Sequence, residues 1–261
     1  MMMIKIILLA ILGCTLGFSQ NNQDQDMDGV PDQLDHCLDT PFLDEVDETG
    51  CSISSHLDIS IGYGFNTNED LVNRATQHAI KFDMSYYYND WNYALKTGII
   101  AGEDDAGMQD TTLKIKRKFN LSDALKINLG VGMKLPTYHI KGNKTDFIVY
   151  ASTRYYPLAS LSLYAGVNHT FVQDKEVTIP LQDTHTFYLG TGYFFTKRFY
   201  ANFTYSEATS KFTSNKNIQS FSSTLFYKIN DNWFSTLSYS HQINDDDLHN
   251  AFNIKIGYSL W

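Results

Sequence analysis

The chain has 261 residues, a formal net charge of -9, 14% aromatic residues and 19% charged residues. The acidic balance argues against nucleic acid as a partner, because proteins that bind nucleic acid present basic surfaces to its phosphates. Beyond the N-terminus no stretch approaches the roughly twenty consecutive apolar residues of a membrane-spanning helix, although strands with apolar residues at alternate positions would escape a hydropathy average.

Residues 1–20 are typical of a secretory signal peptide. Lys5 precedes a short apolar run, and small and polar residues follow that run. This order predicts export with cleavage after Ser19 or Gln20, so the segment does not belong to the mature fold. Lipidation of Cys14, which stands in a sequence similar to a lipobox, is one alternative, and an ordinary buried first helix is another.

Residues 24–35 place carboxylates at the spacing of a calcium-binding loop. The expected ligands are five side chains and one backbone carbonyl: Asp24, Asp26, Asp28, Asp32 and Asp35, with the carbonyl of Val30. Calcium prefers six to eight hard oxygens, and Gly29 stands at the sixth loop position, where the chain must turn sharply. Asp35 departs from the EF-hand pattern, which has a glutamate there. The alternative is a solvated acidic linker, but its carboxylates would repel one another without a cation.

Two cysteines, Cys37 and Cys51, remain once the signal peptide is excluded. An even number of cysteines in an exported chain indicates one disulfide, because the periplasm is oxidising.

The segment from Asp24 to Cys51 resembles a thrombospondin type 3 repeat of bacterial envelope proteins. After the aspartate loop it continues through Asp35-His36-Cys37-Leu38-Asp39-Thr40-Pro41 and closes with Val46-Asp47 and Gly50-Cys51, with Leu38 in place of the usual proline. The resemblance implies calcium at the Asp24 loop and a disulfide between Cys37 and Cys51. It also allows a second, weaker ion site formed by Asp39, Asp44 and Asp47. A bridge that closes so short a loop contributes about 3 kcal/mol in the chain-entropy model.

From Leu57 to the C-terminus, apolar residues recur at every second position in block after block. In one block Leu125, Ile127 and Leu129 alternate with polar or small residues, which gives a strand one apolar and one polar face. Twelve such blocks occur, near residues 56–66, 77–88, 91–101, 110–119, 124–135, 145–156, 160–172, 184–195, 198–206, 217–229, 232–242 and 251–261. Their lengths suit tilted membrane-crossing strands, and an even number is typical of single-chain bacterial barrels. We therefore predict an all-β fold: a twelve-stranded antiparallel transmembrane β-barrel over residues 56–261, preceded by a calcium-loop module over residues 21–55.

The connections between these blocks alternate between short and long. The short ones follow the even-numbered blocks: Asn89-Asp90, Asn120 to Asp123, Pro157 to Ala159, Thr196-Lys197 and Asn230-Asp231. Longer, more polar connections follow odd-numbered blocks, as in Thr67 to Thr76 and Gln173 to Asp183. Barrels of Gram-negative outer membranes have short periplasmic turns and long outer loops. We therefore expect the chain in the outer membrane, in contact with its lipid, with the N-terminal module in the periplasm.

The alternation alone does not fix which face of the barrel is outside. Aromatic residues crowd the short turns, as at Tyr86-Tyr87-Tyr88 and Trp233-Phe234, which is typical of the girdle at a bilayer interface. Glycines such as Gly130 and Gly132 occupy the polar phase and suit a crowded lumen. A water-soluble barrel with its apolar face inside is the alternative.

An apolar outer face would bring ten cationic residues into the lumen: Lys81, Lys96, Lys114, Lys116, Lys118, Lys126, Lys134, Arg154, Lys228 and Lys255. Only Asp58, Asp83 and Asp146 oppose them, which predicts a positive interior that favours small anions. The residues expected to carry this function are Lys96, Lys114, Lys116, Lys126, Lys134 and Arg154. The alternative is a plugged barrel whose lysines pair with carboxylates or extend toward the rims.

Three classes of function remain open: a small pore that prefers anions, a non-conducting structural or adhesive envelope protein, and an outer-membrane hydrolase. The candidates for a hydrolase are His169, His185 and His241 with Ser238 and Ser240, but no nucleophile elbow or metal spacing accompanies them. We therefore expect no enzymatic activity, calcium as the cofactor, and lipid, calcium and small anions as the partners.

Overall fold

The computed structural model describes residues 24, 29–38, 40, 46–53, 55–69, 74–102, 106–122, 124–138, 142–174, 181–213, 217–243 and 248–260. The chain divides into two compact units, Met1–Ser52 and Ile53–Trp261. The expected signal peptide, including Cys14, lies outside the described residues, as do the expected ligands Asp26 and Asp28. Within the described ranges no helix is long and apolar enough to cross a membrane.

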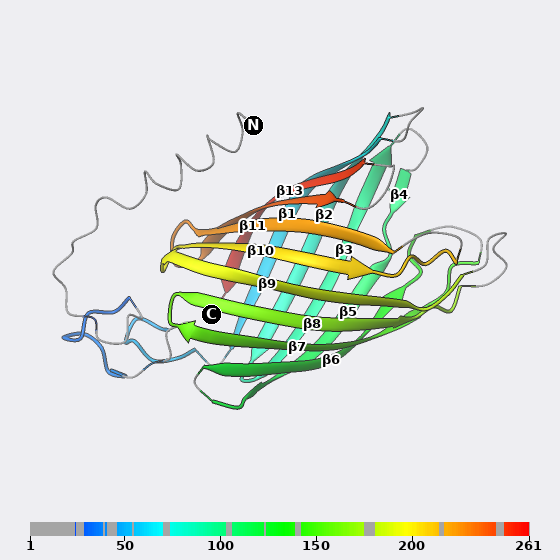
Figure 1. Ribbon diagram of the computed structural model, residues 1–261. Helices are drawn as coiled ribbons and strands as arrows, with labels where there is room; N and C mark the ends of the chain where they lie inside the picture. Colours follow the sequence, from blue (N-terminus) through cyan, green and yellow to red (C-terminus); the bar gives the residue numbers. More distant parts are fainter. Residues whose placement is uncertain are drawn as a thin grey trace. The chain divides into compact units, whose positions relative to one another are not determined.

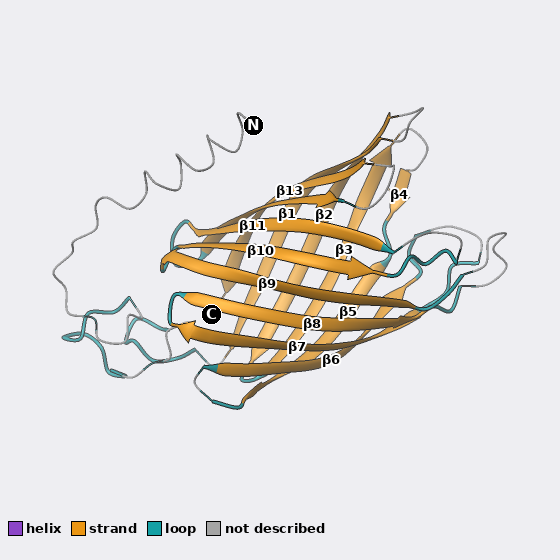
Figure 2. Cartoon of the chain, in the orientation of Figure 1, coloured by secondary structure: helices purple, strands orange, loops and turns teal. Residues whose placement is uncertain are grey.

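The second unit is built from β-strands (Figures 1 and 2). The strands are β1 Ser55–Glu69, β2 Arg74–Tyr88, β3 Trp91–Gly102, β4 Ala106–Met108, β5 Thr111–Asn120, β6 Leu125–Leu135, β7 Asp146–Leu158, β8 Leu161–Phe171, β9 Thr184–Thr196, β10 Phe199–Ala208, β11 Ile218–Lys228, β12 Trp233–Gln242 and β13 Leu248–Leu260. Strands that follow one another in the chain pair antiparallel, and β1 pairs with β13, from Leu57 opposite Leu260 to Glu69 opposite Leu248. The sheet therefore closes on itself.

The short strand β4 does not add a strand to the circumference. Both β4 and β5 pair with β3, β4 at Ile99 to Ala101 and β5 at Trp91 to Lys96. Between these contacts the two residues Thr97 and Gly98 lie opposite three, 109–111, which is the pattern of a β-bulge. Counting β4 and β5 as one bulged strand, the barrel has twelve antiparallel strands. The predicted all-β, twelve-stranded antiparallel barrel is confirmed.

Short turns lie at one end of the barrel and longer connections at the other (Figure 1). The short turns comprise residues 89–90, 121–124, 159–160, 197–198 and 229–232. At the long-loop end β1 and β2 continue beyond the predicted limits of residues 66 and 77, since polar pairs such as Thr67 opposite Thr76 extend their ladder. Alternating hydrophobicity predicts only the part of a strand that has an apolar face. The strands extend further because backbone hydrogen bonds also form between residues with polar side chains.

The apolar side chains point out of the barrel. Ile61 is 56% exposed, Ile99 60% and Val131 57%, and the residues next to them in sequence are less exposed. Among the described residues only Ala79 and Ile100 are buried apolar side chains. Outward aromatics gather toward the short turns: Tyr86, Tyr88, Trp91, Tyr93, Tyr155, Tyr193, Phe195, Tyr227 and Trp233. The alternation in the sequence did not fix which face of the barrel is outside. The structure shows that the apolar face is outside.

Inside the barrel, tyrosines of one strand lie over glycines of a neighbouring strand. A Cβ atom added at Gly190 would come within 2.6 Å of Tyr164, and one added at Gly192 would collide with Tyr200. Because a larger residue would collide with these rings, the glycines allow them to lie flat against the wall. The wall from β8 to β10 is therefore lined by rings and hydroxyl groups.

Candidate functional site

The predicted cations lie on the inward face of the strands. Lys114 is opposite Gly132 and Lys116 is opposite Gly130, while the intervening Ile115 points outward and is 42% exposed. The same register places Lys96 beside Thr112 on the inward face. Lys126 and Arg154 are likewise cross-strand neighbours near the short-turn end of β6 and β7.

The three inward carboxylates neutralise few of these cations. Asp83 forms an ion pair with Lys255. Asp58 accepts a hydrogen bond from the Ser259 hydroxyl at 2.6 Å, and Asp146 accepts one from the backbone N–H of Gln173 at 2.8 Å. Among the residues that the structure describes, only Asp83 of these three carboxylates is therefore paired with a lumen lysine.

Two further carboxylates reach lumen lysines from the ends of the barrel. Asp110 contacts Lys134 at 3.0 Å at the long-loop end, and Asp90 contacts Lys118 at 3.8 Å at the short-turn end. Among the described residues no carboxylate lies within 4.0 Å of Lys96, Lys114 or Lys116. The middle of the lumen therefore holds cations without an anionic partner of their own.

Tyr150 of β7 lies against two of these lysines. The Nζ atoms of Lys114 and Lys116 are 4.8 and 5.0 Å from the centre of its ring, within the range of a cation–π contact. The ring reaches β5 by crossing β6 over two glycines, since a Cβ atom at Gly132 would approach it to 3.1 Å and one at Gly130 would approach Lys116 to 2.7 Å. The hydroxyl of Tyr150 is buried and has no hydrogen-bond partner.

Sequence reasoning did not single out Tyr150. The signal that could have found it is an aromatic residue in the polar phase of its strand, next to a strand with glycine at two successive inward positions.

A second feature of the lumen is a polar cavity of about 370 Å³ closer to the short turns. Its lining consists of amides, hydroxyls and one guanidinium: Asn128, Ser152, Thr153, Arg154, Tyr164, Tyr188, Asn202, Thr204 and Thr224. The Arg154 guanidinium stacks 5.2 Å from the centre of the Tyr164 ring, and the Tyr164 hydroxyl is 2.6 Å from the Thr204 hydroxyl. Such a lining is suited to water and to polar solutes.

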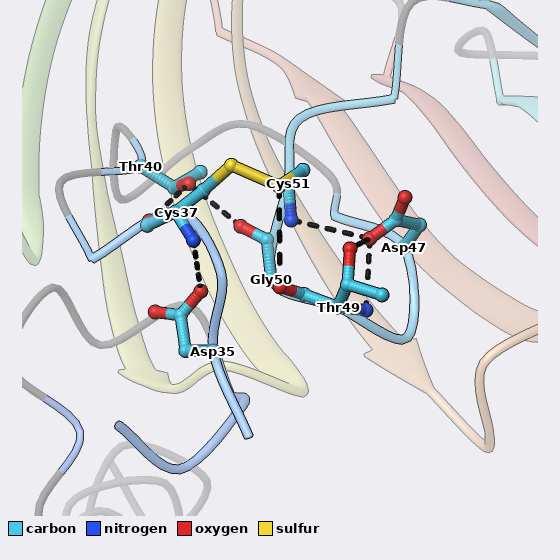
Figure 3. Close-up of a disulfide and its surroundings, with 7 residues drawn as sticks. All are labelled: Asp35, Cys37, Thr40, Asp47, Thr49, Gly50 and Cys51. Carbon is cyan, nitrogen blue, oxygen red and sulfur yellow. Dashed lines mark hydrogen bonds between the residues drawn. A yellow bond between two sulfur atoms is a disulfide. The ribbon is translucent and has the colours of Figure 1, made fainter. Parts of the chain in front are cut away.

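The first unit is closed by a disulfide between Cys37 and Cys51 (Figure 3), as the sequence predicted. The Thr40 hydroxyl, 6% exposed, donates a hydrogen bond to the Gly50 carbonyl at 2.7 Å. Asp47 caps the turn before Cys51: one of its carboxylate oxygens accepts hydrogen bonds from the hydroxyl and backbone N–H of Thr49 and the N–H of Cys51. These hydrogen bonds, led by the Thr49 hydroxyl, hold the pKa of Asp47 below its ordinary value.

The described part of the acidic loop suits a cation in two respects. Gly29 has a φ of 98°, a left-handed conformation that favours glycine, and its N–H donates to the Asp24 carboxylate at 3.1 Å. One oxygen of Asp35 accepts the Cys37 N–H at 2.7 Å, whereas its other oxygen is buried without a hydrogen-bond partner. Among the described residues, which include Asp24, Asp32 and Asp35, no three acidic, histidine or cysteine side chains converge on one point.

The residues considered for a hydrolase are not assembled into a catalytic triad. His169 and His185 lie side by side on β8 and β9, with their Nδ1 atoms 3.1 Å apart, and Asp183 is 3.6 Å from His169. Ser238 lies on β12, opposite Asn253 of β13. Among the described residues, the pair of His169 and His185 therefore has Asp183 beside it but no serine in contact that could act as the nucleophile.

Asp110, which sequence reasoning also missed, links strands and loops at the long-loop end through hydrogen bonds and an ion pair. Besides Lys134, it binds the side-chain amide of Asn143 at 2.8 Å and the backbone N–H of Tyr138 at 3.0 Å. Burial alone would raise the pKa of Asp110, but these hydrogen bonds and the Lys134 ammonium hold it below its ordinary value. Asp110 lies in the bulge, so its position depends on a break in strand pairing that alternation cannot reveal.

No protein-family model and no curated protein sequence matches the chain. Among solved structures, the NanC porin is 13% identical with a TM-score of 0.57, over 78% of this chain and 100% of that chain. The KdgM porin in complex with disordered oligogalacturonate is 14% identical with a TM-score of 0.54, over 77% and 99%. An outer-membrane channel from Pseudomonas putida F1 is 9% identical with a TM-score of 0.65, over 80% and 96%. These likenesses establish that the chain has the fold of outer-membrane β-barrels.

The contacts of Asp110 generate a prediction about pH. Its lowered pKa means that the charged carboxylate stabilises the attachment of Tyr138 at neutral pH, and that this stabilisation is lost as the pH falls below the ordinary value of 3.8. In detergent-folded protein, the NMR signal of the Tyr138 amide should stay constant from pH 7 to about 4 and shift only below that. Asp110→Asn should show the shifted signal already at pH 7, and the turn variant Asp231→Asn should not. A titration midpoint above 3.8 would contradict this account.

Proposed function

We propose that the chain is an outer-membrane pore that prefers small anions and carries a calcium-stabilised module before its barrel. The observation that supports the anion preference is the set of inward lysines, Lys96, Lys114 and Lys116, that have no carboxylate of their own among the described residues. A charged ring that lines a pore favours ions of the opposite sign.

The energetic cost of burying charge supports a water-filled lumen. An isolated ammonium group in a dry interior costs far more than the folded state can supply, so it is hydrated, paired or neutralised. The described carboxylates that contact lumen lysines, Asp90, Asp110 and Asp83, form their ion pairs with Lys118, Lys134 and Lys255. A barrel of twelve strands also encloses more interior than the eight-stranded barrels that side chains fill completely. Hydration is therefore the favoured solution for the remaining lysines, and water gives small solutes a path.

The direction of the barrel in the membrane follows from its two ends. Outer-membrane barrels have short turns on the periplasmic side, and here β1 begins and β13 ends at the short-turn end. We therefore place the N-terminal module in the periplasm. A broad-specificity protease added to whole cells should cut within the loop between β8 and β9 and leave the segment from Asp24 to Cys51 intact. The same protease should cleave that segment once the outer membrane is permeabilised. Cleavage of the segment in intact cells would reverse the orientation.

The anion preference is tested by the reversal potential of the folded chain in a planar bilayer under a potassium chloride gradient. We expect a potential of the sign that indicates chloride as the more permeant ion. Replacing Lys114, Lys116 and Lys126 by glutamate should move the potential toward potassium selectivity, because three charges inside the lumen are reversed. The control Lys197→Glu with Arg198→Glu alters the turn 197–198 outside the lumen and should change the potential little. Folded protein without any conductance would overturn the pore and favour a non-conducting envelope protein.

We also propose that the Asp24 loop binds one calcium ion through Asp24, Asp26, Asp28, Asp32 and Asp35 and the carbonyl of Val30. Support comes from the spacing of these residues, from the left-handed turn at Gly29, and from the buried oxygen of Asp35 that accepts no hydrogen bond. A buried carboxylate oxygen without a donor is unfavourable, and a hard cation would satisfy it. Asp47 is engaged in its own turn, so this proposal includes a single ion.

Calcium titration calorimetry of the full folded chain tests this site. We expect one ion to bind with a dissociation constant between about 10⁻⁷ and 10⁻³ M, the range of sensor and extracellular sites. Asp35→Asn should weaken binding strongly, because it replaces the carboxylate whose free oxygen is buried. Asp231→Asn, in a turn of the barrel, should leave the binding unchanged. Absence of binding at millimolar calcium would refute the site.

A further inference from the structure

We propose that Lys96, Lys114, Lys116 and Tyr150 form a binding site for a compact, doubly charged oxyanion of the phosphate class in the middle of the lumen. This inference rests on the proposed pore, because the ligand must reach the site through water. It extends the proposed pore by assigning a binding site at a defined position in the lumen and the chemical class of the ion that binds there.

The first support is a set of donors that lacks an acceptor. The ammonium groups of Lys114 and Lys116 flank the Tyr150 ring at 4.8 and 5.0 Å from its centre. An ammonium group can only donate hydrogen bonds. The Tyr150 hydroxyl is buried and makes no hydrogen bond. In the described part of the barrel wall no carboxylate is close enough to receive these donors. An anion between them would be the missing acceptor.

The second support is the local charge. Lys81, Lys96, Lys114 and Lys116 lie close enough to influence one another electrostatically. Asp83 interacts electrostatically with Lys81 and Lys114, and it already forms an ion pair with Lys255. The cluster therefore keeps a net positive charge of several units, which attracts a dianion more strongly than chloride.

The donor types select among multivalent anions. Lysine presents a compact point charge with rotatable donors and is a common ligand of phosphate, whereas the planar fork of arginine binds carboxylates and phosphates in two-point contacts of fixed geometry. The cluster contains lysines and a phenol, and Arg154 lies apart from it, in the cavity near the short turns. The donors come from Lys114 and Lys116, two residues apart on the same face of β5, which suits a small tetrahedral ion.

The wall of the barrel holds the site in a defined position. Tyr150 reaches the lysines only because Gly130 and Gly132 leave β6 without side chains at the crossing. The ring therefore has a fixed place beside the two ammonium groups, and its hydroxyl is held by the barrel wall.

Calorimetric titration of inorganic phosphate into the full folded chain, at neutral pH in chloride buffer, tests the site directly. We expect one phosphate to bind, and Tyr150→Phe to weaken it about tenfold, because one hydrogen bond to a charged group is removed while the ring remains. Lys116→Gln should weaken phosphate binding at least as much. The matched control Arg117→Gln removes the same charge from the outward face of the same strand, where the guanidinium stacks on Trp91 and Phe119, and should leave the affinity unchanged.

Chloride current through the same proteins separates this site from the proposed pore. We expect phosphate to reduce the current of the wild-type barrel and of Arg117→Gln, and to reduce that of Tyr150→Phe only at about tenfold higher concentration. Phosphate binding without conductance would refute the pore and retain the site. Conductance without phosphate binding, or equal affinities in wild type, Tyr150→Phe and Lys116→Gln, would refute the site and retain the pore.

Discussion

The structure depends on one constraint: apart from the short β4, every strand of the sheet pairs on both sides, so the sheet closes into a barrel. Because side chains alternate across each strand, closure also sorts them into one outward and one inward set. The outward set is apolar, as Ile61, Ile99 and Val131 illustrate. An apolar exterior with satisfied backbone groups is the condition for stability in a bilayer. The position of every lysine in the lumen follows from the same closure.

The charge distribution inside the barrel depends on which groups the carboxylates contact. Those near the ends stabilise structure, with Asp110 holding the segment around Tyr138 and Asp90 contacting Lys118. In the middle, Asp83 pairs with Lys255, and Lys114 and Lys116 face Tyr150 instead of an acid. Near the ends of the barrel, Lys134 and Lys118 are therefore paired with carboxylates, whereas among the described residues Lys114 and Lys116 have no such partner. This distribution links the proposed anion preference to the proposed phosphate site.

The sequence predicted the features that depend on local pattern. Period-two alternation located the twelve strands, and the cysteine count together with the repeat pattern predicted the bridge between Cys37 and Cys51. It could not predict the bulge that contains Asp110, because an extra residue in one strand is defined only by its partner β3. Nor could it predict the contact of Tyr150 with Lys114 and Lys116, since that contact crosses an intervening strand and depends on register. The acidic loop could be proposed from spacing alone, because its carboxylates are close together in the sequence.

The most direct test of this account is a spin-label accessibility scan of β5 in the barrel folded into bilayers. Labels replacing Leu113, Ile115 and Arg117 should collide with lipid-soluble oxygen, and labels replacing Lys114, Lys116 and Lys118 should collide with a water-soluble nickel chelate. The account predicts that the two signals alternate with a period of two residues and in opposite phase. Lysine positions that neither reagent reaches, or an alternation of reversed phase, would contradict a lipid-facing apolar surface around a water-filled lumen.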